Sequence, residues 1–410
     1  MKSKSSYAKY IVAVSFLTVF ANYGTRYTFG VFFKPLLDEF SISRTAVSAI
    51  FSLNILVYGL SVPFTGWLTD RFGGRWVVVT GGILGGFGFI MMAISHKIWE
   101  IYFAYGVMIA IGSALMGYSV VTTIVSRWFD KKKGLANGIT SIGIGAGTLI
   151  LSPLAGWMIK YMGYRDSFII LGIFIFLIVS IPSFIVFRYT YPHQISSEKS
   201  SQIIADFSLR DLLVSKSFWF LSCIYFMYIF SDFSAFTHQV IYARDMGIEA
   251  VAAASIGGLI GGASILGRFF FPWLSDHLRQ RKYSLIIAYL WIIAGFIILN
   301  NVKTISGFYL YALVLGIGYG GVGGLFPSLV SERFPQNRMG VAMGVITTLG
   351  CVGGVIGPVI AGYTFELTGK YFWVWNLVIF ISLIGVLSSF LLPKSIRKGI
   401  VSPFEITSDL

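Results

Sequence analysis

Long apolar stretches separated by short polar connections make up most of the chain. Each stretch has roughly 20 residues or more, which at about 1.5 Å rise per residue is enough for a helix to cross a bilayer. We predict twelve membrane-spanning helices from this pattern. They cover residues 10–34, 45–68, 75–95, 99–129, 134–161, 164–187, 218–242, 250–274, 283–300, 305–330, 340–364 and 370–392.

The pattern repeats itself at a constant offset of 206 residues, so that Gly147 corresponds to Gly353 and Asp70 to Asp276. An internal repeat of this kind fixes an architecture better than a single motif does. It predicts an all-α polytopic membrane protein with twelve transmembrane helices in two pseudo-symmetric six-helix bundles. The expected division is an N-terminal bundle (1–187), a central cytoplasmic loop (188–216), a C-terminal bundle (217–393) and a cytoplasmic tail (394–410).

Composition excludes a soluble globular protein, because 56% of the residues are hydrophobic and the mean hydropathy is +0.79. The net charge of +14 would suit a nucleic-acid partner. However, roughly two thirds of the 31 Lys and Arg residues fall in the connections on one side of the predicted bilayer. This is the positive-inside pattern. It indicates a multi-pass protein of the plasma membrane (the cell inner membrane of a bacterium) with both termini in the cytoplasm, and no nucleic-acid partner.

Three ionisable residues, Arg26, Asp232 and Arg268, lie inside predicted spans, where a charge is costly and usually marks a functional site. Two cations and one anion leave a net charge that suits a single anionic substrate. We find no metal-ligand cluster and no nucleotide-binding loop in the sequence, so neither an enzyme nor a cofactor is expected. Cys223 and Cys351 also fall inside spans and are expected to be buried packing residues.

The segment Gly66–Arg75 resembles the major facilitator signature Gly-x-x-x-Asp-Arg-x-Gly-Arg-Arg, and the repeat echoes it around Asp276. An acid at a helix end with arginines nearby can bridge to a neighbouring helix. The resemblance therefore implies the major facilitator fold, with its site between the two halves. It also implies a cytoplasmic gate, formed by Asp70, Arg71, Arg75 and Asp276.

The segments Asn22–Phe33 and Arg127–Gly138 look like the monocarboxylate transporter family and its bacterial relatives, which include the oxalate/formate antiporter. This resemblance implies that Arg268 binds the substrate carboxylate, for which a guanidinium offers a matching planar fork. Arg26 is a second candidate for binding the anion, and Asn22 either binds a substrate hydroxyl or joins two helices. Three tyrosines match positions that line the cavity in the antiporter: Tyr27, Tyr118 and Tyr319.

Two of the departures of this chain from the family bear on the substrate and the proton. Ser264 stands where the animal monocarboxylate transporters have an aspartate, and Ile346 stands where the antiporter has a lysine. We therefore advance the hypothesis that Asp232 carries the coupling proton, while Arg26 and Arg268 exchange partners between this carboxylate and the substrate. The alternative is a permanent Arg26–Asp232 ion pair that only joins the halves.

Together these features predict a secondary active transporter that moves a small monocarboxylate, such as lactate, pyruvate or acetate, by alternating access and together with a proton. The expected partners are the organic anion, protons and the lipid bilayer, with a monomer as the functional unit. One alternative is a carboxylate exchanger of the oxalate/formate type, which needs no proton. A non-transporting carboxylate sensor is another. A drug-efflux pump is disfavoured, because the fifth span lacks the Gly-Pro-x-x-Gly-Gly run of such pumps.

Overall fold

The computed structural model describes residues 2–129, 133–187, 209–278, 280–334 and 339–393, and within these ranges every regular element is a helix. Eleven helical segments among the described residues are long and apolar enough to cross a membrane. The helix α1, which covers most of the first predicted span, is not among these eleven; it contains the polar residues Asn22 and Arg26. The predicted all-α fold is confirmed. The predicted tail and most of the predicted central loop lie outside the described residues.

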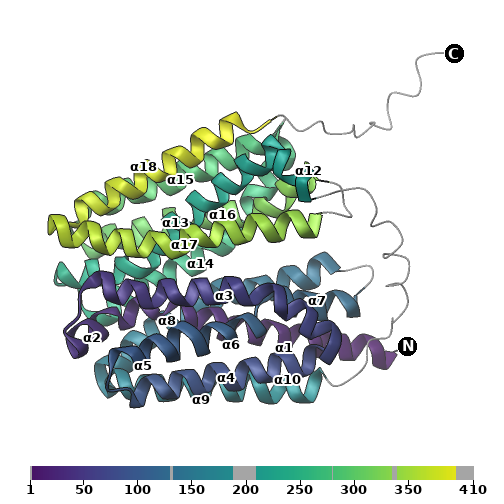
Figure 1. Cartoon of the computed structure of the whole chain (residues 1–410), viewed down its shortest axis with the longest axis horizontal. Coiled ribbons are helices and arrows are strands. Elements are labelled where there is room, and N and C mark those ends of the chain that lie inside the picture. Colours follow the sequence, from purple (N-terminus) through teal and green to yellow (C-terminus); the bar gives the residue numbers. More distant parts are fainter. Residues whose placement is uncertain (1, 130–132, 188–208, 279, 335–338, 394–410) are drawn as a thin grey trace.

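The helices run side by side along a common direction (Figure 1). The N-terminal half contains α1 (Lys2–Tyr27), α2 (Phe29–Phe40), α3 (Arg44–Phe72), α4 (Gly74–Ile94), α5 (Ile98–Phe103), the π-helix η1 (Ala104–Ile109), α6 (Ala110–Leu115), α7 (Tyr118–Trp128), α8 (Lys133–Met162), α9 (Tyr164–Ile175), the π-helix η2 (Phe176–Ser180) and α10 (Ile181–Val186). The C-terminal half contains α12 (Leu209–Val214), α13 (Lys216–Asp245), α14 (Ala250–His277), α15 (Arg281–Asn301), α16 (Ile305–Ser331), α17 (Met339–Thr368) and α18 (Tyr371–Leu391).

The repeat seen in the sequence is also present in the contacts. Gly147 of α8 lies so close to the carbonyl of Phe20 in α1 that a side chain would collide with it. Gly353 of α17 meets the carbonyl of Phe226 in α13 in the same way. Both members of the second pair follow those of the first by 206 residues. Glycine at these positions lets two helix backbones approach closely, as is common in membrane proteins.

The two halves meet along three helix pairs, in which α8 packs on α14, α17 packs on α3 and α2 packs on α13. In Figure 1 α3, α8, α14 and α17 lie in the middle of the molecule, with α4 and α9 on one side and α15 and α18 (green to yellow) on the other. We call this contact region the seam. Backbone contacts are frequent within it: Gly145 of α8 meets the carbonyl of Gly261 in α14, and Gly30 of α2 meets that of Phe236 in α13.

Candidate functional site

A cavity of about 800 Å³ lies between the halves, with walls from α1, α3, α7, α13 and α17. Apolar side chains make up most of its wall, and tyrosines bring hydroxyl groups to it. Tyr118, one of the predicted site residues, lines the cavity, as do Tyr23, Tyr58 and Tyr225. Cys351 lines it as well. Both Cys351 and Cys223 are only half-buried, so the expectation of buried residues is wrong for the two cysteines.

A row of aromatic rings leads from the cavity wall across the seam. The hydroxyls of Tyr23 and Tyr58 are 3.3 Å apart, and the ring of Tyr23 is 5.8 Å from that of Tyr27. Tyr27 stacks on Phe236 at 4.9 Å, and Phe236 meets the edge of Tyr319 at 5.7 Å. The structure thus brings two predicted residues, Tyr27 and Tyr319, together on either side of one phenylalanine ring. We call these five rings, of Tyr58, Tyr23, Tyr27, Phe236 and Tyr319, the aromatic row.

Arg268 lies at the end of the aromatic row that belongs to the C-terminal half, with its guanidinium carbon 6.0 Å from the centre of the Tyr319 ring. Its charge also acts on the hydroxyls of Tyr118 and Tyr225 in the cavity wall. The Nε atom is buried without a hydrogen-bond partner, and no carboxylate of the described residues lies within ion-pair distance of the side chain. Because an unsatisfied buried donor is costly, this cation is suited to accept an anionic ligand.

Arg26 lies at the other end of the aromatic row, which belongs to the N-terminal half. It stands in the last turn of α1, and only 3% of it is exposed. Its Nε donates to Oδ1 of Asn54 at 3.0 Å, and its guanidinium carbon is 3.9 Å from the centre of the Tyr58 ring. Asn54 in turn donates to the carbonyl of Tyr105 at 2.7 Å. Nη2 of Arg26 has no partner among the described residues. Asn54 therefore holds Nε of the guanidinium, while Nη2 keeps donors that no described residue uses.

Asp232 of α13 is 1% exposed, and neither carboxylate oxygen has a hydrogen-bond partner in the described part of the chain. The hydroxyl of Tyr228, one turn earlier, donates to the carbonyl of Tyr319 at 3.1 Å, and the charge of Arg268 acts on the Asp232 carboxylate. Arg26 binds Asn54 rather than Asp232, so the permanent Arg26–Asp232 ion pair considered above is not formed in this structure. These two residues correspond through the repeat but do not neutralise each other.

Asn22 is a fixed part of the N-terminal half. Its side-chain Nδ2 donates to the carbonyl of Ser113 in α6 at 3.0 Å, which joins α1 to the fourth span. Its Oδ1 is buried without a partner in the described residues. An amide oxygen accepts hydrogen bonds and repels a carboxylate, so this group is suited to a ligand hydroxyl.

Two of the four predicted gate residues form ion pairs, and each of these pairs lies within one half of the described chain. Asp70 pairs with Arg127 of α7, in its own half. Asp276 pairs with Arg281 at 3.3 Å, also within one half. The remaining two predicted gate residues lie over aromatic rings: Arg71 is 5.2 Å from the Trp67 ring and Arg75 is 3.8 Å from the Phe184 ring. At this end, the ion pairs of the described residues stabilise each half separately.

Contacts across the seam gather at the opposite end of the molecule, which we call the tied end. Lys160 of α8 pairs with Glu249 at 2.9 Å, and Arg44 of α3 pairs with Asp245 of α13 at 2.7 Å. The hydrogen bond from Lys160 holds the pKa of Glu249 below its ordinary value. Deeper in, the buried ring of His238 is hydrogen-bonded to Oγ of Ser48 at 2.9 Å.

Sequence reasoning missed the roles of Tyr58, Tyr225 and Arg127 in these contacts. A signal was present for the first two. Tyr58 follows Asn54 by one helical turn, and Tyr225 precedes Asp232 by two, so each shares a helix face with a polar intramembrane residue. Arg127 was recognised only as part of a family motif, because its pairing with Asp70 depends on how α7 packs on α3.

Comparison with known proteins gives a consistent result. A sequence profile of the Major Facilitator Superfamily matches residues 15–358. Human "Monocarboxylate transporter 2" is 24% identical over 390 residues, covering 88% of this chain and 80% of that protein. The "Oxalate:formate antiporter" of Oxalobacter formigenes is 26% identical over 353 residues, covering 82% and 81%. Among solved structures, an inward-facing, unoccupied bacterial homologue of the human lysosomal transporter Spinster superposes with a TM-score of 0.79 at 16% identity, covering 94% and 97%.

Proposed function

Because the chain belongs to the Major Facilitator Superfamily, we propose that it carries a small monocarboxylate of the lactate, pyruvate or acetate kind across the plasma membrane together with a proton. Relatives named as monocarboxylate transporters and as an oxalate:formate antiporter support the substrate class. The monomer, with both termini in the cytoplasm, is the proposed functional unit.

One observation carries the substrate class: no carboxylate of the described residues lies within ion-pair distance of Arg268, and its charge acts on tyrosine hydroxyls of the cavity wall, although Arg268 itself does not line the cavity. A guanidinium binds a carboxylate through two parallel hydrogen bonds. Hydroxyls of Tyr118 and Tyr225 are near enough to feel its charge and are suited to complete the binding of the carboxylate. The apolar remainder of the wall suits a short hydrocarbon tail.

The distribution of contacts supports alternating access. Ion pairs such as Lys160–Glu249 and Arg44–Asp245 join the halves at the tied end, while at the other end Asp70 pairs with Arg127 and Asp276 with Arg281, each within one half of the described chain. With both termini in the cytoplasm, as the positive-inside pattern favours, the tied end would face the outside. In this state the cavity would open to the cytoplasm, and release of the tied end would open it outward.

Asp232 is the proposed proton carrier. A carboxylate buried without hydrogen-bond partners is strongly disfavoured, whereas a protonated carboxyl costs far less to bury. In the present state the neutral form therefore suits this site. Approach of Arg268, once the substrate has left it, would favour ionisation and so release the proton.

The proposal is tested in liposomes that contain the purified protein and a pH-sensitive dye, with no anion inside. Lactate, pyruvate, acetate, formate and oxalate are added in turn, and protein-free liposomes correct for passive leak of the acid. We expect a protein-dependent acidification with at least one monocarboxylate and its loss in Asp232→Asn. Acidification that is unchanged in Asp232→Asn would refute the role of this residue.

Anion exchange is the second candidate function, because one relative is named an oxalate:formate antiporter. Exchange predicts no proton signal in empty liposomes and uptake only after anion has been loaded inside. Ile346, where the antiporter has a second cation, is fully buried and apolar here, which disfavours a dicarboxylate. A sensor that binds without transport would give neither signal.

A further inference from the structure

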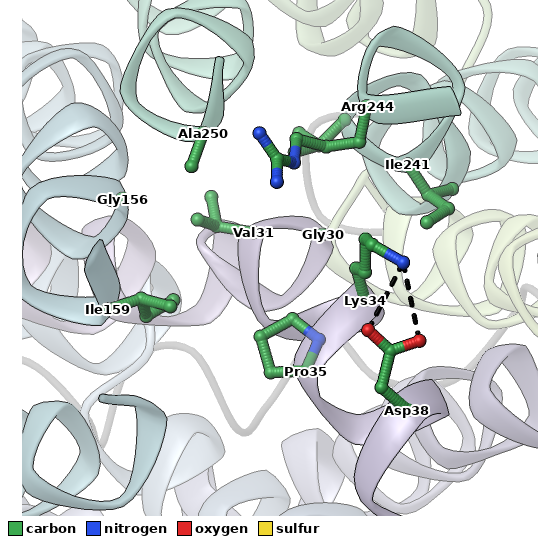
Figure 2. A pocket seen from close by; sticks show the side chains of 11 residues that line it. Gly30, Val31, Lys34, Pro35, Asp38, Gly156, Ile159, Ile241, Arg244 and Ala250 are labelled. Carbon is green, nitrogen blue, oxygen red and sulfur yellow. Dashed lines mark hydrogen bonds and ion pairs between the residues drawn. The ribbon is translucent and has the colours of Figure 1, made fainter. Parts of the chain in front are cut away.

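A second, smaller pocket of about 170 Å³ lies at the tied end, between α2, α8, α13 and α14 (Figure 2). It shares no lining residue with the central cavity. Its walls come from both halves of the molecule. The side chains of Lys34 and Asp38 at its rim are 41% and 56% exposed, so the pocket is reached from solvent.

The pocket combines one available cation with an apolar wall. Figure 2 shows the guanidinium of Arg244 extending over the pocket toward Ala250 and Val31, with Ile159 on the far side. Its Nη1 donates to the carbonyl of Ile248 at 3.0 Å. No carboxylate of the described residues lies within ion-pair distance of Arg244.

The neighbouring cations differ from Arg244 in this respect, because each of them has an acidic partner. Lys34 pairs with Asp38 at 3.1 Å. Lys160 pairs with Glu249, and Arg44 with Asp245. Arg244 retains guanidinium donors that the backbone bond does not use, and it holds them at the pocket. A surplus positive charge in a pocket with an apolar floor is the arrangement that selects a small organic anion.

We propose that this pocket binds a short monocarboxylate, with the carboxylate on Arg244 and the hydrocarbon part against Val31, Ile159 and Ala250. A cavity needs only about 10–15 Å³ to hold one water molecule, so 170 Å³ admits an anion of a few heavy atoms. Lys34 and Asp38 at the rim form an ion pair with each other, so Arg244 supplies the surplus positive charge of the pocket.

The position of the pocket gives it a regulatory consequence. Since α2 and α8 form one wall and α13 and α14 the other, the pocket exists only while the tied end is closed. A ligand that binds one conformation alone shifts the population toward it. Excess carboxylate on the outer side would then hold the tied end shut and slow the cycle. The inhibition of transport rests on the proposed function, whereas the binding of a carboxylate to this pocket does not.

Binding of radiolabelled lactate to the purified full-length protein tests the pocket separately from the central site. In Arg268→Gln, which disables the central site, we expect a weaker, saturable binding to persist. Adding Arg244→Gln should weaken it about tenfold or more, as expected for loss of a charge-assisted hydrogen bond. Ala250→Phe should do the same by filling the space while keeping the charge. Lys303→Gln, an exposed cation at the same end, is the matched control and should change nothing.

The outcomes are separable from those of the transport assay. Binding in Arg268→Gln that both Arg244→Gln and Ala250→Phe weaken supports the pocket, even if the liposomes show no transport. Saturable binding that is absent from Arg268→Gln, or that neither pocket variant affects, overturns it, even if the wild type transports lactate. In transport, the wild type should slow at high outer lactate, and Ala250→Phe should relieve this inhibition.

Discussion

Gly30 of α2 packs against the carbonyl group of Phe236 in α13, and the two residues are counterparts in the internal repeat. A residue that touches its own counterpart must lie on the pseudo-symmetry axis that relates the halves. The axis therefore passes through the seam beside the ring of Phe236. The ring of Phe236 separates Tyr27 from Tyr319, so the aromatic row crosses the axis.

Gly30→Leu should prevent closure of the tied end, because its side chain would collide with the Phe236 backbone, which cannot repack. We expect the outward-open population to rise and transport to fall at least about tenfold. Labelling of a cysteine placed at Ser48, beside His238 in the closed seam, measures the opening. Gly66→Leu is the control, since nothing lies within 4 Å of a Cβ added at Gly66. Equal labelling in the two variants would contradict the role of Gly30.

Arg268→Gln should lower kcat/KM for monocarboxylate uptake about 30-fold or more, through loss of a charge-assisted hydrogen bond pair worth roughly 2–3 kcal/mol. Arg268→Lys keeps the charge but loses the planar fork, and its activity should lie between those of the wild type and Arg268→Gln. Uptake of labelled lactate at several concentrations separates the effects on KM and kcat. Wild-type kinetics in Arg268→Gln would show that Arg268 does not bind the substrate.

Cys351 should react with a polar maleimide in the conformation described here, because its half-buried thiol lines the central cavity. Cys223 should react more slowly, since its sulfur contacts Oγ of Ser388 at 3.4 Å and does not line that cavity. Mass spectrometry after timed labelling compares the two sites within one sample. A bound substrate should protect Cys351, and equal rates at the two thiols would show that the cavity is closed to the reagent.

Asn54→Leu should destabilise the protein by about 1.5–3 kcal/mol, because it leaves the buried Nε of Arg26 without its hydrogen bond. The double variant Asn54→Leu/Arg26→Met removes both partners and should recover part of the loss. Thermal unfolding in detergent measures the three proteins. If the double variant is less stable than Asn54→Leu, the bond does not hold Arg26 in the manner described.

Acid should weaken the Lys160–Glu249 bridge only at low pH. The pKa of Glu249 is lowered by Lys160, so the bridge is complete above the ordinary glutamate pKa of about 4.3 and is lost as the pH falls through the lowered value. Glu249→Gln should therefore keep the wild-type pH dependence of uptake between about pH 5 and 8. Asp232→Asn should flatten that dependence. If Glu249→Gln flattens the pH dependence and Asp232→Asn keeps it, the coupling proton is carried by Glu249 at the tied end and not by Asp232.

The spans were predictable because a helix in lipid needs a long apolar stretch, and their ends agree with α3 to α18 within a few residues. Tyr118 lies in the cavity wall, as the family resemblance implies, but Tyr27 and Tyr319 are not among the residues that line this cavity. The partner of Arg26 was not predictable. The choice between Asn54 and Asp232 depends on the rotation of α1 against α3, which hydropathy does not encode.

Cys351 illustrates a second limit. A helix face that lines an apolar cavity has the same composition as a face buried in the bundle, so the sequence alone suggested packing. The break between α1 and α2 at Thr28 and the π-helix over Ala104–Ile109 also left no sequence signal that we recognised. Both depend on contacts with distant helices rather than on local preference.

Glycine-to-backbone contacts of the seam also bear on how such a protein can evolve. Side chains that line the cavity, such as Tyr58, Tyr225 and Cys351, can be exchanged singly, and each exchange reshapes the space offered to cargo. Gly30 and Gly145 have no such freedom, because one added carbon meets a main-chain atom that no neighbouring substitution can remove. New cargo preferences can therefore arise without altering the moving parts, so diversification of specificity is separable from preservation of the motion.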